Sequence, residues 1–176
     1  PLDFIGFNYY TREVAQAPCS TDEVARGYRF VPPDPAPGLT GMGWEIYPQG
    51  MSRILAKLSA GWPLPPIWIT ENGAADNTPL VDGVCDDQMR CAYLQSHLAQ
   101  VSAAMAQGID VRGYYVWSLL DNFEWVFGYA SKLGLVAVDP GAARLVAHGH
   151  EVVVLLPGHE RPLRAEHVLL PPHLTQ

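Results

Sequence analysis

The stretch that most constrains this chain is Pro66–Gly73, which reads Pro-Ile-Trp-Ile-Thr-Glu-Asn-Gly. A short apolar run between prolines and an Asn-Gly turn signal predicts a buried β-strand. The run ends on a carboxylate, Glu71, although a buried strand normally ends on an apolar or turn residue. In parallel α/β barrels the chemistry lies at the C-terminal strand ends, because the βα loops converge there. Glu71 is therefore either a candidate catalytic carboxylate or a solvated residue at a strand exit.

Strand-like and helical segments alternate along most of the chain. Aromatic and β-branched runs predict strands at Leu2–Tyr9, Ile67–Glu71, Val111–Ser118 and Gly134–Asp139. Periodic apolar residues predict helices over Gln49–Ala60 and from Asp86 or Asp87 to about Gln107. This order predicts parallel βαβ units whose helices cover a sheet of the first three strands, with both sheet edges open for pairing. The fourth strand is expected to extend beyond that sheet.

The connecting segments and helix faces carry further expectations. Arg12–Glu45 is rich in Pro and Gly and is predicted to be one long functional loop. The predicted core stripes of the two helices are Met51, Ile54, Leu55 and Leu58, and Leu94, Leu98, Val101 and Met105. His97 lies one residue from the second stripe, so we interpret it as a structural or partly exposed histidine rather than a catalytic one.

The composition excludes several classes of function. The 176 residues are 48% hydrophobic, enough for one domain, and the formal net charge of −7 disfavours nucleic-acid partners. No apolar run is long enough to span a membrane, and the start at Pro1, with neither a signal segment nor an initiator Met, is typical of a fragment. Cys19, Cys85 and Cys91 lack metal-ligand spacing, so we expect no metal, no cofactor and reduced thiols in a cytoplasmic protein.

Polar and aromatic residues follow the C-terminal ends of the first three predicted strands. They are Asn8 and Tyr10, then Glu71 and Asn72, then Trp117, Asp121, Asn122, Glu124 and Trp125. Carboxylates and amides bond to sugar hydroxyls, while aromatic faces stack on the apolar face of a sugar ring. These residues together predict a sugar site at one mouth of the fold. Core packing is the reasonable interpretation for Trp62 and Trp68, and a weaker one for Trp117 and Trp125, which stand beside acidic residues.

Four segments carry a more specific pattern: Asp-Phe-Ile-Gly-Phe-Asn-Tyr-Tyr (3–10), Met-Gly-Trp-Glu-Ile-Tyr-Pro (42–48), Ile-Thr-Glu-Asn-Gly (69–73) and Gly-Tyr-Tyr-Val-Trp-Ser-Leu-Leu-Asp-Asn-Phe-Glu-Trp (113–125). In this order they closely resemble glycoside hydrolase family 1, the β-glucosidase family of (β/α)8 barrels. The resemblance covers residues 1–139. It implies an α/β fold that is a partial TIM (β/α)8 barrel, comprising strands six to eight, with an atypical C-terminal tail.

The resemblance also implies a role for each matched residue. Glu71 would be the nucleophile of a retaining double displacement and would form a covalent glycosyl-enzyme. Tyr10 would donate a hydrogen bond that keeps this carboxylate ionised and aimed at the anomeric carbon, and Asn8 would support the same centre.

The other matched residues would bind substrate. Trp117 would form the platform under the sugar, Glu124 and Trp125 would bind its outer hydroxyls, and Trp44 would line the aglycone side. Because the Glu124 carboxylate would repel a phosphate, the implied substrate is an unphosphorylated β-glucoside or a related β-glycoside.

The sequence departs from the family pattern because it lacks the acid/base glutamate. The family's acid/base glutamate lies in an Asn-Glu-Pro motif, which does not occur in this sequence. Glu124 matches a sugar-binding position, so we do not expect it to complete a retaining pair, whose carboxyls lie about 5–5.5 Å apart. The implied function is β-glucosidase-type hydrolysis, present as a fragment without the acid/base half. The alternatives are a non-catalytic sugar-binding remnant, or one half of a split enzyme whose partner is the missing N-terminal barrel half.

The resemblance stops after Asp139. Just before this point Lys132 and Leu133 stand where the family usually has Arg-Phe. Residues 140–176 contain five of the six histidines and several prolines, among them those at 157, 162, 171 and 172, without a helical pattern. We interpret residues 1–139 as the barrel part, and residues 140–176 as a divergent tail that is frame-shifted or disordered.

Overall fold

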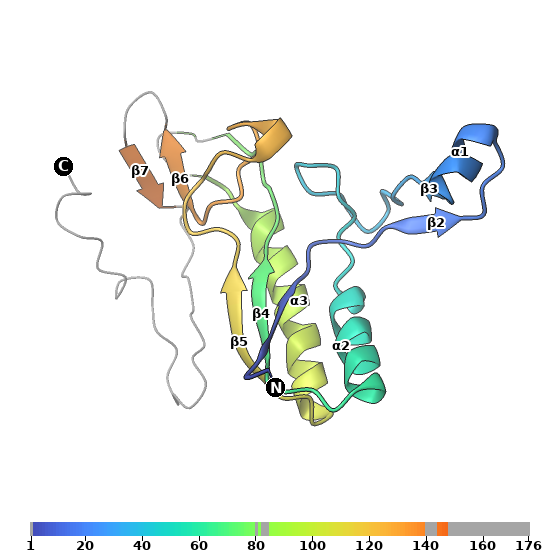
Figure 1. The fold of residues 1–176 in the computed structure, drawn as a ribbon. Coiled ribbons are helices and arrows are strands. Elements are labelled where there is room, and N and C mark those ends of the chain that lie inside the picture. The colour runs from blue at the N-terminus through green and yellow to red at the C-terminus, as the bar shows by residue number, and fades with distance from the viewer. Residues whose placement is uncertain (1, 80, 82–84, 140–143, 148–176) are drawn as a thin grey trace.

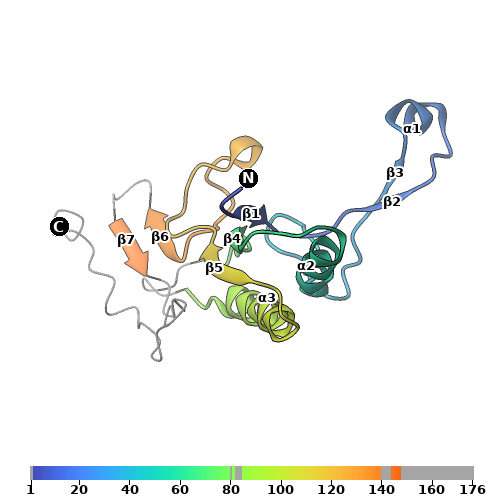
Figure 2. The same cartoon turned by 60° about the horizontal axis from the view of Figure 1, so that its bottom comes forward.

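The computed structural model describes residues 2–79, 81, 85–139 and 144–147. Its centre is a parallel sheet in the order β1 (Ile5–Asn8), β4 (Ile67–Asn72) and β5 (Val111–Val116). Helices α2 (Gln49–Gly61) and α3 (Gln88–Ala106) connect these strands and pack on one side of the sheet, as Figure 2 shows. The predicted α/β class and the order of these strands and helices are confirmed. Both helices begin and end within two residues of their predicted first and last residues.

The core lies between the sheet and the two helices. Side chains alternate across a strand, so Ile67 and Ile69 of β4 point toward the helices and are almost completely buried. They pack with Met51 and Leu55 of α2 and with Val111 of β5. Two of the four residues predicted as the stripe of α2 are therefore fully buried, while Ile54 is 37% exposed.

The buried face of α3 differs from the predicted one. Leu94 and Leu98 are only partly buried, and Met105 is 50% exposed. The residues that face the sheet and its loops are Arg90, Tyr93, His97, Val101 and Ala104. Val101 is buried as predicted, but the rest of the buried face was missed because Arg90, Tyr93 and His97 bury polar groups, most of them hydrogen-bonded, which an apolar periodicity does not detect.

The opposite face of the sheet carries aromatic side chains, and no helix of the described residues covers it (Figure 2). The ring of Trp68 stacks on that of Tyr115 at 6.1 Å and meets that of Phe4 edge-on at 6.5 Å. Phe4 and Tyr115 remain more than half exposed. Trp68 is therefore partly buried on this open face. Trp62 is 61% exposed just after the end of α2, so its assignment to the core was wrong.

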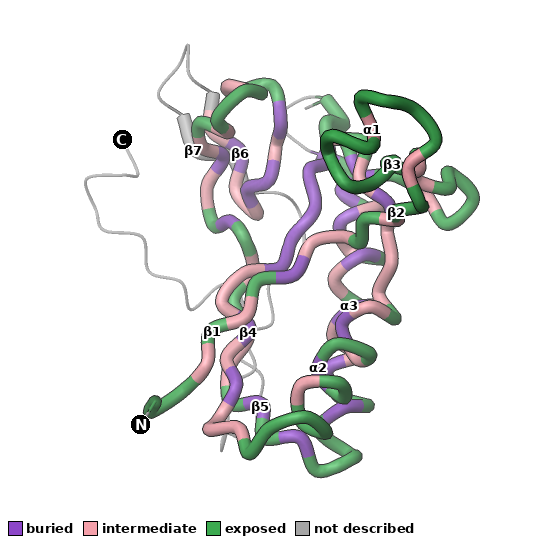
Figure 3. The backbone as a smooth tube through the Cα atoms, turned by 45° about the vertical axis from the view of Figure 1, so that its right-hand side comes forward, coloured by how far each residue is buried: buried purple, intermediate pink, exposed green. Residues whose placement is uncertain are grey.

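The segment predicted as one long loop contains three elements. Strands β2 (Val14–Gln16) and β3 (Arg29–Val31) form an antiparallel pair joined through α1 (Thr21–Arg26). This β2–α1–β3 unit, here called the arm, projects from the body in Figure 1 and is mostly exposed in Figure 3. The Ser20 side chain caps α1, and Gly27 ends it in the left-handed conformation. The prediction gave too much weight to Pro and Gly content and overlooked these capping signals.

The last strands form a separate sheet. β6 (Val136–Asp139) pairs antiparallel with β7 (Arg144–Ala147). β6 lies outside the three-stranded sheet, as predicted for an extension, and begins two residues later than expected. Apart from β7, the predicted tail lies outside the described residues. Within the described part of the chain, no helix combines the length and apolar character needed to cross a membrane.

Candidate active site

The candidate nucleophile lies where β4 leaves the sheet beside the end of β1. The backbone N–H of Tyr9 donates to the carbonyl of Glu71 at 3.0 Å, which fixes the two strand ends together. The next residue, Tyr10, donates its phenolic hydroxyl to Oε2 of Glu71 at 2.6 Å. Burial, and then this bond to Glu71, raise the pKa of Tyr10 well above its ordinary value. Tyr10 is therefore a permanent donor to one carboxylate oxygen.

Asn8 is placed at the same mouth but has a different partner. Its register partner across the β1–β4 ladder is Glu71. Its side-chain oxygen accepts a hydrogen bond of 2.5 Å from the hydroxyl of Thr70, on the open face of the sheet. The predicted neighbourhood is therefore present, with Asn8 bonded to Thr70 rather than to Glu71.

The loop after β5 brings the predicted platform and a second carboxylate together. The indole nitrogen of Trp117 donates to Oε1 of Glu124 at 3.1 Å. The Glu124 charge also contributes to the raised pKa of Tyr10, because a nearby negative charge disfavours a phenolate. The backbone N–H of Trp117 also donates to the carbonyl of Asn72, the residue after Glu71, at 3.0 Å, so the two pairs lie at the same end of the sheet. Trp125 differs from both pairs, since its side chain is 85% exposed.

The side chains of two polar residues predicted at this mouth form hydrogen bonds with groups of their own loop and of the segment after it. Asp121 is buried, and its carboxylate accepts from the backbone N–H groups of Gly134 at 2.9 Å and Val138 at 3.2 Å. Asn122 donates to the hydroxyl of Ser118 at 3.2 Å. Their place in the sugar-binding set was wrong, because the loop needs acceptors and donors for its own polar groups.

Asn72 was also expected at the mouth, but its side chain is completely buried. Its amide nitrogen donates to the carbonyl of Tyr9 at 2.6 Å and to the hydroxyl of Tyr93 at 3.1 Å. Its oxygen accepts from the hydroxyl of Tyr114, and Tyr93 in turn donates to the carbonyl of Tyr10 at 2.9 Å. Sequence reasoning did not identify Tyr93 or Tyr114. Their position directly behind Glu71 makes them supporting residues of the site.

The close contact between β4 and the platform depends on a glycine. A Cβ atom on Gly73 would lie 1.9 Å from the carbonyl oxygen of Trp117. The backbone N–H of Trp117 also donates to the carbonyl of Asn72 at 3.0 Å. The end of β4 and the backbone of Trp117 are thus in direct contact.

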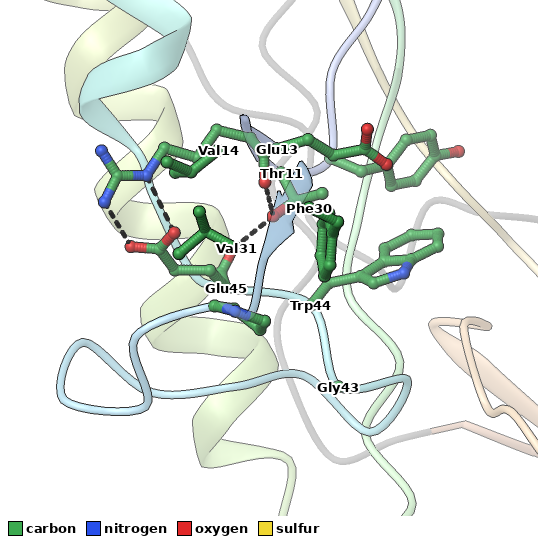
Figure 4. Close-up of a pocket in the computed structure, with 11 residues that line it drawn as sticks. Thr11, Glu13, Val14, Phe30, Val31, Gly43, Trp44 and Glu45 are labelled. Atoms are coloured by element: carbon green, nitrogen blue, oxygen red, sulfur yellow. Dashed lines mark hydrogen bonds and ion pairs between the residues drawn. The ribbon is translucent and has the colours of Figure 1, made fainter. Parts of the chain in front are cut away.

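Residues of the arm and Trp44, which follows the arm in the chain, line one groove next to the site. Its ring meets that of Tyr10 edge-on at 5.6 Å, and both line a groove of about 570 Å³ with Phe30 and Val31 of the arm (Figure 4). At the base of this groove the buried Glu45 carboxylate accepts two hydrogen bonds of 2.8 Å from Arg12. Trp44 therefore lies beside Tyr10, while its expected place on the aglycone side stays a prediction; the Arg12–Glu45 pair was not foreseen.

His97 has a structural environment, as predicted. Its Nδ1 atom lies 2.8 Å from the carbonyl of Tyr93, which can only accept, so Nδ1 carries the proton. Its ring stacks on that of Tyr93 at 3.9 Å, and burial lowers the pKa of His97. The described residues contain no cluster of three His, Cys, Asp or Glu side chains that could hold a metal ion.

Comparisons with known proteins identify the family of this chain. The sequence model of Glycosyl hydrolase family 1 matches residues 1–151. Beta-glucosidase A of Thermotoga maritima is 42% identical over 140 residues, which cover 78% of this chain and 30% of that protein. The bifunctional beta-D-glucosidase/beta-D-fucosidase of Bifidobacterium breve is 41% identical over 152 residues, which cover 79% of this chain and 33% of that protein.

Solved structures give the same result. The beta-glucosidase from Thermotoga maritima in complex with glucoimidazole matches with a TM-score of 0.77 and 39% identity, over 85% of this chain and 32% of that chain. An enzyme from Alicyclobacillus herbarius matches with the same TM-score and 36% identity. The chain spans about a third of the length of the relatives it matches.

Proposed function

Because this chain belongs to glycosyl hydrolase family 1, we propose that it carries the nucleophile of a retaining β-glycoside hydrolysis and that Glu71 is that nucleophile. Its structural neighbours are TIM barrels of the family, and its fold is part of such a barrel. The observation that carries the proposal is the 2.6 Å hydrogen bond from Tyr10 to Oε2 of Glu71. It orients a carboxylate at the mouth of the strands, beside an aromatic platform.

The first chemical step follows from this geometry. Tyr10 occupies Oε2, so we assign the attack on the anomeric carbon to Oε1 of Glu71. The new carbon–oxygen bond forms while the bond to the leaving oxygen breaks, and the sugar becomes covalently attached to the enzyme. The leaving oxygen requires a proton from a second carboxyl group. This sequence has no Asn-Glu-Pro motif that would provide it.

The absence of the acid/base motif from this sequence bears on which part of the barrel the chain forms. We propose that β1, β4 and β5 correspond to barrel strands six, seven and eight, and that the acid belongs to the earlier strands. The chain's coverage of about a third of its relatives supports this assignment. Among the described residues β1 and β5 are the edge strands of the sheet, and they would pair with the missing N-terminal barrel half, as in a split enzyme. A sugar-binding remnant without turnover is the alternative.

The proposed substrate is an unphosphorylated β-glucoside or a related β-glycoside. The names of the relatives, which include beta-glucosidases and a beta-D-fucosidase, support this class. Trp117 would form the sugar platform, with Glu124 held beside it by the indole nitrogen. Trp125 would add hydroxyl contacts, and Trp44 would line the aglycone side of the groove. Asn8, whose side chain is bonded to Thr70, would support the same catalytic centre as Tyr10.

Two further interpretations from the sequence stay predictions. One is the division of the chain at residue 139, with a frame-shifted or disordered tail after it. Sequencing the 3′ end of the coding region, together with mass spectrometry of a tail peptide, tests that division. The other is the cytoplasmic location, which rests on cysteines that are free in the described residues.

A reagent that needs no acid tests the nucleophile directly. In 2,4-dinitrophenyl 2-deoxy-2-fluoro-β-glucoside the leaving group departs without a proton, and the fluorine slows hydrolysis of the glycosyl-enzyme. We expect one glycosyl unit on the peptide that contains Glu71, and none with Glu71→Gln. Label that appears only after the N-terminal barrel half is added indicates a split enzyme. Sugar binding without label in either case indicates a remnant and contradicts the proposed chemistry.

A further inference from the structure

Behind the candidate nucleophile lies a buried polar network that the proposed reaction does not itself use. It joins Asn72 of β4, Tyr93 of α3 and Tyr114 of β5. We propose that Tyr93 is a positioning residue for Glu71 and acts through Tyr10. The proposal rests on the assigned role of Glu71 as nucleophile.

The hydrogen bonds of this network leave each polar group satisfied. The Asn72 amide nitrogen donates to the Tyr9 carbonyl and to the Tyr93 hydroxyl, and its oxygen accepts from Tyr114. The Tyr93 hydroxyl uses its own proton to donate to the Tyr10 carbonyl at 2.9 Å. Burial raises the pKa values of Tyr93 and Tyr114, so both keep the protons that these bonds require. The network thus has one consistent arrangement of donors.

Tyr10 needs this support because it lies just beyond the sheet. The last ladder contact of β1 is the bond from the Tyr9 N–H to the Glu71 carbonyl. The Tyr93 hydroxyl then holds the carbonyl of Tyr10, whose phenol reaches forward to Glu71. Fixing this carbonyl fixes the direction in which the Tyr10 side chain leaves the backbone. Tyr93 therefore controls the bond that orients the carboxylate.

Tyr93 is itself held in place on α3. Its side chain is almost completely buried, and its ring stacks on that of His97 at 3.9 Å. One turn earlier, Arg90 donates to the carbonyls of Ala74 at 3.0 Å and Lys132 at 2.7 Å. These bonds fasten the start of α3 to the loops that follow β4 and β5. The Tyr93 hydroxyl is consequently a fixed point against which Tyr10 is positioned.

The test compares Tyr93→Phe, Tyr10→Phe and the double variant with a control, Tyr28→Phe. Each single change removes one hydroxyl, and Tyr28 lies in the arm, away from the network. The first readout is the rate constant for labelling Glu71 by the fluoroglucoside, with its binding constant measured separately. The second is the crystal structure of each variant. In the control, both readouts are expected to match those of the unaltered chain.

We expect Tyr93→Phe to slow labelling by roughly three- to tenfold, with unchanged binding of the reagent. This is the effect expected from losing the buried neutral hydrogen bond to the Tyr10 carbonyl, the one of the two Tyr93 bonds that bears on Glu71. In the Tyr10→Phe background the same change should cause no further loss, because Tyr93 acts through the Tyr10 phenol. In the structure, the Tyr10–Glu71 distance should lengthen from 2.6 Å to beyond about 3.5 Å.

Two results overturn the proposal. The first is an intact Tyr10–Glu71 hydrogen bond in the structure of Tyr93→Phe. The second is that Tyr93→Phe slows labelling equally in the unaltered chain and in the Tyr10→Phe background. The second result would mean that Tyr93 only stabilises the fold. If the unaltered chain takes no label either alone or with the N-terminal barrel half added, the assignment of Glu71 as nucleophile fails. The crystal structures then decide on Tyr93 alone, because the distance between Tyr10 and Glu71 is measured without any reaction.

Discussion

The contact between Gly73 and the Trp117 carbonyl gives the sharpest test of how the site is assembled. In Gly73→Ala the new methyl group would lie 1.9 Å from the Trp117 oxygen, whereas an ordinary contact is 3.4–4 Å. The obstructing atoms belong to the backbone, so no side-chain rotation can relieve the overlap. The end of β4 and the platform must therefore separate by about 1.5 Å, since 3.4 minus 1.9 is 1.5.

This displacement has two expected effects. Overpacking of this kind costs about 1–3 kcal/mol of the free energy of unfolding. A misplacement of about 1 Å at a reacting centre can reduce the rate about a hundredfold. We therefore expect the labelling of Glu71 to slow by about two orders of magnitude. The midpoint of urea unfolding should decrease, but the variant should remain folded without urea.

The matched control is Gly61→Ala at the end of α2, where an added Cβ meets nothing within 4 Å. This variant should label at the normal rate. Its stability should be unchanged or about 0.4–1 kcal/mol higher, because alanine reduces the freedom of the unfolded chain. If Gly73→Ala labels at the same rate and unfolds at the same urea concentration as Gly61→Ala, the contact between Gly73 and the Trp117 backbone does not set the distance between β4 and Trp117.

Two further predictions concern buried charge and proton binding. In Arg90→Met the ion pair with Asp87, whose two side chains are 1% and 2% exposed, is broken; we expect a loss of about 3–5 kcal/mol in urea unfolding. Replacing both residues, as Asp87→Leu with Arg90→Met, should recover much of that loss, and no recovery would contradict an origin in the ion pair. For His97, whose folded-state pKa is lowered by burial, the unfolded chain binds the proton first as the pH falls. Stability should therefore decrease below about pH 6.5, and His97→Gln should flatten that decrease between about pH 6.5 and 5.5 in urea unfolding. An identical slope in both proteins would exclude His97 as its source.

The sequence predicted the features that depend on short, local patterns. The strand ending at Glu71 and the two long helices are set by apolar spacing and by turn residues next to them. The neighbourhood of Glu71, Tyr10 and Trp44 was expected from matched motifs, and the structure brings these residues together. Their catalytic and binding roles stay proposals.

The remainder depends on contacts between distant segments. Asn72 and Asp121 resembled ligand-binding residues because both are polar and lie at strand ends. Their side chains instead satisfy backbone groups brought close by folding, such as the Tyr9 carbonyl and the Gly134 N–H. The buried face of α3 was missed for the same reason, since Tyr93 is buried by its hydrogen bonds as well as by its ring. Residue type alone does not distinguish a polar group that binds substrate from one that binds the chain itself.

The arm has a consequence for how proteins of this kind diversify. None of the residues of α1 is buried, yet Phe30 and Val31 at the end of the arm line the groove beside Trp44. Substitutions or length changes in the arm therefore alter the groove wall while leaving the packed sheet and helices untouched. Under the proposed function, aglycone preference can evolve, or be engineered by exchanging arms between homologues, separately from the residues that hold the nucleophile. If the proposed function holds, recognition of the leaving group and the chemistry of the sugar are separable in this architecture.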